Sequence, residues 1–160
     1  MLMTAVILVV VLAAVVLGSA RLGLFAGNAS TNLGLREGKL KPPSKTPNSV
    51  SSQANLWPDH PQRSYAAIAP LPLKGDGPAT IARLVQIIEG MAGAQVVERK
   101  PDYLYVQFTT QLMRFVDDAE FWFDPVAGVI QVRSASRVGR GDLGVNRARI
   151  EGIRARLAAG

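Results

Sequence analysis

The first twenty residues constrain this chain more than any other segment. Leu2–Ala20 contains no formally charged side chain and includes the run VILVVVLAAVVL at 6–17. Nineteen helical residues extend about 28 Å, close to the thickness of the hydrocarbon core of a bilayer. We expect residues 1–27 to form a transmembrane anchor or a signal segment. The uncleaved single-pass anchor is favoured, because the start MLMT lacks the basic side chains of a signal peptide.

Two arguments give opposite orientations for this anchor. Arg21, Arg36, Lys39 and Lys41 follow the apolar run and no charged side chain precedes it, which favours a cytoplasmic domain by the positive-inside rule. An export signal would place the same domain outside. Both orientations therefore stay open on these residues alone.

The rest of the chain divides into a tether and a folded domain. Residues 28–66 are rich in Asn, Ser, Pro and Gly and have few spaced apolar residues, which predicts an extended tether that partly docks onto the domain. From residue 67 to residue 160 the apolar residues recur with the periods of strands and helices.

The expected elements of this domain follow in a simple order. Residues 68–73 form a short edge strand with two prolines, and a helix begins after Asp76. Strands follow at 94–99, 103–110, 116–124 and 129–136, and Asn146 caps a final helix. The order β-α-β-β-β-β-α predicts an α+β fold: an antiparallel sheet of about five strands with two helices packed on one face, preceded by the transmembrane helix.

The hairpin around residues 125–128 has a predictable register. With these four residues as the loop, Phe123 faces Ile130 and Glu120 faces Arg133. One side of the hairpin is then apolar, and the other side carries a cross-strand pair of opposite charges. A slip of one residue would lose both matches.

Composition excludes several classes of site. The 160 residues contain no cysteine and one histidine, His60, so no thiolate nucleophile, disulfide or His-rich zinc site is expected. Gly139, Gly141 and Gly144 lack the spacing of a dinucleotide loop. We therefore expect no metal and no cofactor.

The positive charge is concentrated near the end of the chain. The formal net charge is +6, and residues 133–156 hold seven arginines and two acidic residues. Such a segment attracts phosphate groups, yet it lacks the aromatic side chains that stack on nucleic-acid bases. Nucleic acid is not an expected partner; an anionic ligand or a lipid headgroup is the alternative to a solvated helix face.

Asp117, Asp118 and Glu120 form the only acidic cluster. Carboxylates this close could act as an acid–base pair, which makes a hydrolase one hypothesis. Strand alternation places Asp118 and Glu120 on one face and Asp117 on the core face, where it needs a donor such as Arg137 or Ser136. Structural ion pairing is the favoured interpretation.

Two further groups of polar residues are candidate binding sites. The glycine-rich loop and helix start bring together four residues that suit an anion, although the same side chains could simply fix the turn. A second group in the tether more simply docks it to the domain. The candidates are Arg137, Asp142, Asn146 and Arg149, together with Asp117, and then Asn48, Ser51, Ser52 and Gln53.

Two segments resemble the domain of unknown function 1499 family. The opening one contains Leu33-Gly34-Leu35, Gly38–Pro42 and Pro47–Gln53, and the closing one runs from Ser134 to Ile150. The resemblance covers residues 33–156 and implies bacterial envelope or plastid proteins, often membrane-attached, without a settled activity. The family's opening motif usually carries two cysteines six residues apart. Pro43 and Ser49 occupy those positions here, so a disulfide or thiol role cannot operate in this chain.

Three functions remain as hypotheses. The favoured one is a membrane-anchored, non-enzymatic accessory domain that binds a partner protein at the cell envelope. The first alternative is a module that binds a small anionic molecule or lipid headgroup through the arginine-rich closing motif, and the second is a hydrolase. The family and the export-like start favour the inner membrane with the domain in the periplasm, whereas the charge count favours the cytoplasmic face.

Overall fold

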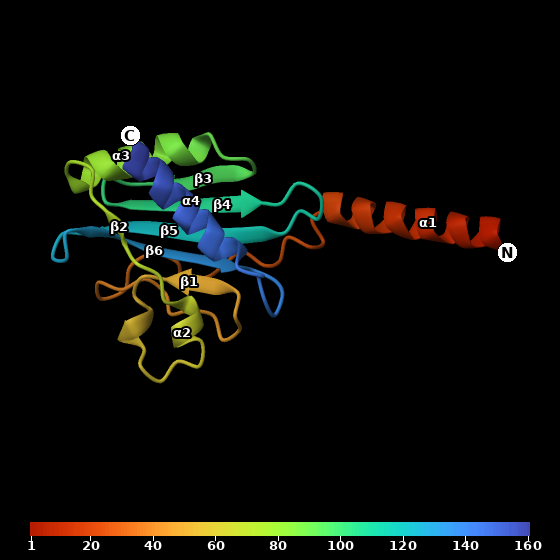
Figure 1. The fold of residues 1–160 in the computed structure, drawn as a ribbon, viewed down its shortest axis with the longest axis horizontal. Helices are drawn as coiled ribbons and strands as arrows, with labels where there is room; N and C mark the ends of the chain where they lie inside the picture. The colour runs from red at the N-terminus through yellow and green to blue at the C-terminus, as the bar shows by residue number, and fades with distance from the viewer.

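The computed structural model describes residues 1–160 as one long helix attached to an α+β domain (Figure 1). The predicted fold class is confirmed. The helices and strands, in chain order, are α1 (Leu2–Arg21), β1 (Ser49–Ser51), the 3₁₀ helix η1 (Ala54–Leu56), α2 (Arg63–Ala66), β2 (Leu71–Pro72), α3 (Gly77–Glu89), β3 (Ala94–Arg99), β4 (Tyr103–Thr109), β5 (Val116–Asp124), β6 (Val129–Ser136) and α4 (Val145–Ala159).

The sheet is antiparallel, with strand order β1-β6-β5-β4-β3, and β2 also pairs with β6. Strands β5 and β6 pair as the sequence predicts: Phe123 faces Ile130 and Glu120 faces Arg133. The prediction succeeds because both faces of this hairpin are specified at once, one by apolar packing and the other by charge.

One face of the sheet carries the apolar core, and helices α3 and α4 contribute to it (Figure 1). α3 begins where Asp76 accepts a hydrogen bond from the Ala79 amide, as a helix-capping carboxylate does. The helices place a stripe of buried residues against the sheet: Ile81, Leu84, Val85 and Ile88 from α3, and Ile150, Ile153 and Leu157 from α4.

The start of α4 differs from the prediction. The helix begins at Val145, and Asp142 rather than Asn146 satisfies its first amides, accepting hydrogen bonds from Gly144 N and Asn146 N at 3.0 and 3.1 Å. Asn146 is fully buried inside the first turn. Asn and Asp both suit caps, so residue type alone could not choose between them.

The segment expected as a tether is closely joined to the sheet. Its residues 49–51 form β1, which pairs with β6, and residues 54–56 and 63–66 form short helices. Upstream of β1, residues 30–42 lie across the face of the sheet opposite α3 and α4, with Leu40 only 1% exposed. We call residues 30–42 the strap. The sheet is therefore covered on both faces, by helices on one and by the strap on the other.

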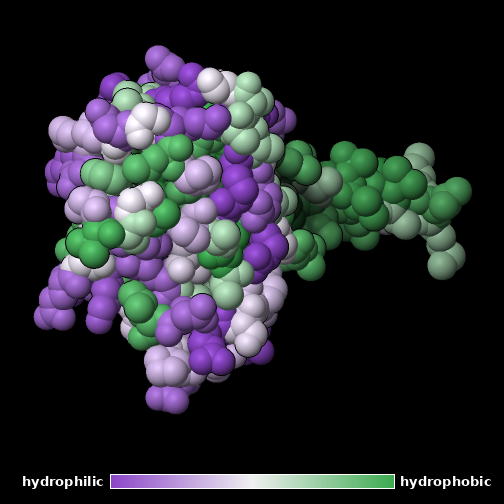
Figure 2. Space-filling view, turned by 60° about the vertical axis from the view of Figure 1, so that its left-hand side comes forward, coloured by the Kyte–Doolittle hydropathy of each residue, from purple (hydrophilic) through white to green (hydrophobic).

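α1 is long and apolar enough to cross a membrane, a property that signal sequences share. Ala20 is its only buried residue. Figure 2 shows its apolar surface standing clear of the domain, whose visible surface is mainly polar. Burial inside the protein does not explain the composition of α1.

Candidate functional site

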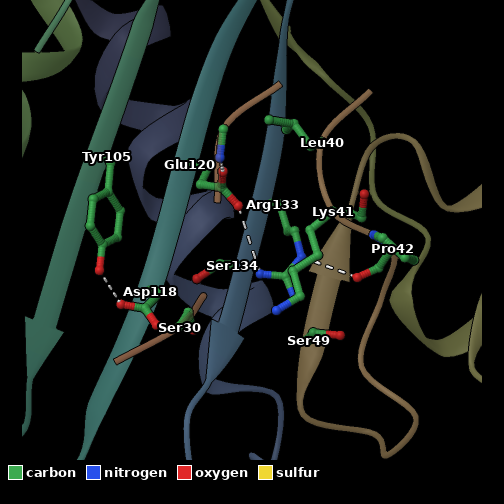
Figure 3. A network of polar contacts seen from close by, with 12 residues as sticks. Ser30, Leu40, Lys41, Pro42, Ser49, Tyr105, Asp118, Glu120, Arg133 and Ser134 are labelled. Carbon is green, nitrogen blue, oxygen red and sulfur yellow. Dashed lines mark hydrogen bonds and ion pairs between the residues drawn. The ribbon is translucent and has the colours of Figure 1, made fainter. Parts of the chain in front are cut away.

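Charged and phenolic side chains are buried between the sheet and the strap. Strand alternation directs Asp118 and Glu120 of β5 to the face opposite the helices, together with residues of the neighbouring strands. Figure 3 shows part of this group, with Ser30 and Pro42 of the strap beside it. We call the group the covered cluster; it comprises Tyr103, Tyr105, Asp118, Glu120, Arg133 and Arg137.

Asp118 is fully buried and fully hydrogen-bonded. Arg137 donates to both of its oxygens, with Nη2 at 2.7 Å from Oδ1 and Nε at 2.9 Å from Oδ2. The hydroxyls of Tyr105 and Ser30 also donate to it, at 2.6 and 2.5 Å. Burial alone would raise the pKa of Asp118, but these hydrogen bonds and the guanidinium charge outweigh it and hold the pKa below its usual value.

Glu120 is also fully buried, but only one of its oxygens is hydrogen-bonded. Oε1 accepts from the Tyr103 hydroxyl at 2.8 Å and from the Gly34 amide at 2.7 Å. Oε2 has no hydrogen-bond partner and lies 3.8 Å from Nη1 of Arg133, which has none either. Burial, and then the charge of Glu120, raises the pKa of Tyr103.

Arg133 has an incomplete set of partners. Its Nε donates to the Pro42 carbonyl of the strap at 3.2 Å, and the side chain is 5% exposed. Burial lowers the pKa of Arg133, although Glu120 and Asp118 oppose the change. The Glu120–Arg133 pair is thus a buried ion pair without a direct hydrogen bond, which gains little stability from its charges.

A second polar group lies on the helix side of the sheet. Asp117 pairs with Nη2 of Arg149 at 2.5 Å, and Nη1 of the same arginine donates to Asn146 and Ser134. The expected donors for Asp117 were Arg137 and Ser136. Arg137 instead lies on the opposite face with Asp118, because residues 117 and 118 alternate and Arg149 arrives from α4.

Asp142 connects this second group to the short helix α2. It accepts from the Tyr65 hydroxyl at 2.5 Å and from the Asn146 side chain at 2.8 Å. Burial alone would raise the pKa of Asp142; the hydrogen bonds from Tyr65, Asn146 and Gly144 outweigh it and lower the pKa. The bond to Asp142 is the main cause of a raised pKa at Tyr65.

The four polar candidates near β1 join the amino-terminal part of the domain to the sheet. The Asn48 carbonyl accepts from Asn146, and the Gln53 side chain accepts from the Leu40 amide of the strap. Ser52 exchanges hydrogen bonds with β6, and the Ser51 hydroxyl accepts from the Gln53 amide.

The structure thus separates the predicted site residues into two groups on opposite faces of the sheet. Asp117, Asp142, Asn146 and Arg149 come together on the helix side, whereas Arg137 joins Asp118 and Glu120 under the strap. Sequence reasoning missed Tyr103, Tyr105, Ser30 and Tyr65. The spacing of Tyr103 and Tyr105 on one strand face was an available signal, but the positions of Ser30 and Tyr65 depend on tertiary folding.

No group of three or more His, Cys, Asp or Glu side chains is placed to hold a metal ion. Asp117, Asp118 and Glu120 instead lie against arginine and tyrosine side chains. Chemically, both groups behave as neutralised polar networks that lock chain segments together.

A family model described as a protein of unknown function (DUF1499) matches residues 39–157. That range includes β1–β6, α2, α3, most of α4 and the end of the strap. The chain belongs to the DUF1499 family. No curated protein and no solved structure matches it. The DUF1499 region contains both polar networks apart from Ser30 and Gly34, while α1 lies outside the matched range.

Proposed function

We propose that this DUF1499 protein is a membrane-anchored accessory domain that binds a partner protein at the cell envelope and performs no catalytic step. The observation that carries the proposal is the connection between α1 and the domain. The strap is held to the sheet through hydrogen bonds from Ser30 to Asp118 and from Gly34 to Glu120, both buried acceptors. An anchor that continues into a firmly attached strap holds the domain at a fixed height and angle, as presentation to a membrane partner requires.

The surroundings of the acidic residues support a structural role over hydrolysis. A general acid or base needs access to substrate and a proton to exchange. Asp118 is fully buried and bonded to Arg137, and Asp117 is bonded to Arg149. These carboxylates are committed to the fold, which favours the accessory function over the hydrolase.

The arginines of the closing motif are similarly occupied. Arg137 and Arg149 pair with buried carboxylates, and Arg147 donates to the carbonyls of Tyr65 and Ala67. An anionic ligand at Arg137 or Arg149 would have to displace these partners. This favours a protein partner over the alternative of a headgroup or anion site built on these two arginines.

Native mass spectrometry of the full-length chain, gently solubilised from its own membrane, tests this proposal. The expected result is a second polypeptide at fixed stoichiometry. A chimera carrying residues 1–27 on an unrelated domain is the control, and it should not retain that polypeptide. A bound small molecule or lipid without a protein partner would contradict the proposal and favour the ligand-binding alternative. Detection of the chain alone would also contradict the proposal.

We further propose that the domain faces the periplasm from the inner membrane. Val126 suits a test because it is 96% exposed, on the β5–β6 turn far from α1 (Figure 1), in a chain without cysteine. Val126→Cys should react with an impermeant maleimide in intact cells whose outer membrane admits the reagent. Reaction only after the inner membrane is lysed would place the domain in the cytoplasm.

A further inference from the structure

Exposed apolar side chains gather at the end of the domain next to α1. After α1, ten large apolar residues are exposed, and six of them lie on the segment that follows α1, on the β4–β5 loop or around the loop before α4. Figure 1 shows these three segments at the same end of the domain. We call this surface the α1-side end. Its six exposed large apolar residues are Leu22, Leu24, Leu112, Phe115, Leu143 and Val145.

The α1-side end is joined to α1 by direct packing. The ring of Phe25, just after α1, lies 6.1 Å from that of Phe115. Gly27 is so close to Val138 and Arg137 that a β-carbon added there would lie 2.7 and 2.8 Å from their side-chain atoms. The β4–β5 loop, the loop before α4 and the end of the helix therefore form one continuous surface.

The position of the β4–β5 loop along α1 determines how deep this loop lies relative to the bilayer. A hollow is lined by Ala14, Leu17, Gly18 and Arg21 of α1 and by Gln111 and Leu112 of the loop. On a helix, residues 14 and 21 are about 10 Å apart along the axis. Arg21 is the first charged residue after the apolar run and marks the level of the headgroups. Ala14, Leu17 and Gly18 lie on the apolar side of Arg21, and Leu112 borders the same hollow as these residues. Leu112 therefore reaches the level of the lipid.

The charges of this end match a phospholipid surface. Arg114 and Arg140 are exposed on its two loops, and Arg21 is exposed at the end of α1. The only acidic residue on these segments, Asp142, is buried and bonded to Tyr65 and Asn146. Apolar tips flanked by arginines are typical of surfaces that lie in a membrane interface.

We propose that the α1-side end is a second membrane contact, in which Leu112 enters the lipid beside α1 and Arg114 and Arg140 meet phosphate headgroups. This inference rests on the proposed anchoring by α1. The bilayer then contacts the domain directly and fixes its tilt, which adds to the constraint imposed by the strap. The surface left for a partner protein is the part of the domain that faces away from the lipid.

Depth-dependent fluorescence quenching tests this contact with the full chain in vesicles of phosphatidylcholine and phosphatidylglycerol. Single cysteines replace Leu112, Val126 or Leu8, each labelled with an environment-sensitive nitrobenzoxadiazole dye. Lipids brominated near the top of the acyl chain should quench the dye at 112, lipids brominated deeper should quench it at 8, and neither should quench it at 126. Leu143→Cys, at a residue fully exposed on the second loop, gives an independent position if the label at 112 disturbs folding.

The quenching results distinguish the second membrane contact from anchoring by α1. Quenching at 8 without quenching at 112 and 143 would overturn the second membrane contact and leave the anchor intact. Absence of quenching at all positions, with the chain bound to vesicles, would overturn the spanning anchor as well. In the Leu112→Cys background, Arg114→Gln with Arg140→Gln should reduce quenching. Unchanged quenching would remove the headgroup role of the arginines.

Discussion

Glu120 and Arg133 face one another in the interior, and each side chain has one polar atom without a hydrogen-bond partner. Both are buried, and their nearest charged atoms are 3.8 Å apart. Removing one charge leaves the other buried without its counterpart, whereas removing both relieves two desolvation costs together.

A double-mutant cycle follows from this arrangement. Arg133→Met alone should lower the free energy of unfolding by about 3 kcal/mol, because Glu120 stays buried without a counter-charge. Arg133→Met combined with Glu120→Gln should recover most of that loss. Urea denaturation measures both values. Additive losses in the double variant would mean that the two residues stabilise the domain independently.

Asp118 makes the covered cluster sensitive to acid. Its pKa is lower in the folded chain than in the unfolded chain, so its contribution to stability is complete above the unfolded value near pH 4 and is lost as the pH falls through the folded value. Asp118→Asn should lower the free energy of unfolding at pH 7 by about 3 kcal/mol and flatten its fall below pH 4.

Asp59→Asn is the matched control for this prediction, since Asp59 is exposed and has no ion-pair partner. Urea titrations between pH 7 and pH 2.5 give the comparison. If the free energy of unfolding of Asp118→Asn falls as steeply in acid as that of the unaltered chain, Asp118 does not cause the acid sensitivity. Asp142 retains its own lowered pKa in this variant, so a smaller slope should remain.

At the scale of elements, the start of α3 gives a local prediction. Asp76→Ala removes the acceptor of the Ala79 amide and should cost about 1 kcal/mol of unfolding free energy, while Asp76→Ser should retain most of it. Thermal unfolding monitored by circular dichroism compares the three chains. Equal stability of the Ala and Ser variants would show that water replaces the cap without loss.

The elements that the sequence predicts well are those with a periodic apolar pattern. The register of β5 with β6 and the start of α3 after Asp76 follow from alternation and from residue type, both local properties. The strap is different. Its hydrogen bonds to the covered cluster are made by a backbone amide at Gly34, a carbonyl at Pro42 and one serine, and no sequence period marks such groups.

The candidate site shows the same limit. Alternation separates Asp117 from Asp118 correctly, but the partner of Asp117 comes from α4, 32 residues away along the chain. Choosing Arg149 over Arg137 requires the position of that helix on the sheet, which sequence spacing does not supply. Local pattern therefore predicts which face a charge occupies, while tertiary packing decides its partner.

At the scale of the whole molecule, the chain consists of an exposed apolar helix, a strap held in place by buried acceptors, and a domain covered on both faces of its sheet. The strap hydrogen-bonds to Asp118 and Glu120 and lies between α1 and β1 in the sequence. We propose that this connection is rigid, so that a membrane spanned by α1 would fix the orientation of the domain.

The most direct test measures the distance between anchor and domain. Spin labels at Leu12→Cys on α1 and Val126→Cys on the β5–β6 turn, in the full chain held in lipid nanodiscs, report it by double electron–electron resonance. Both positions are exposed and the chain has no other cysteine. A single narrow distance distribution is predicted. A broad distribution, as a freely moving tether gives, would show that the connection between α1 and the domain is flexible.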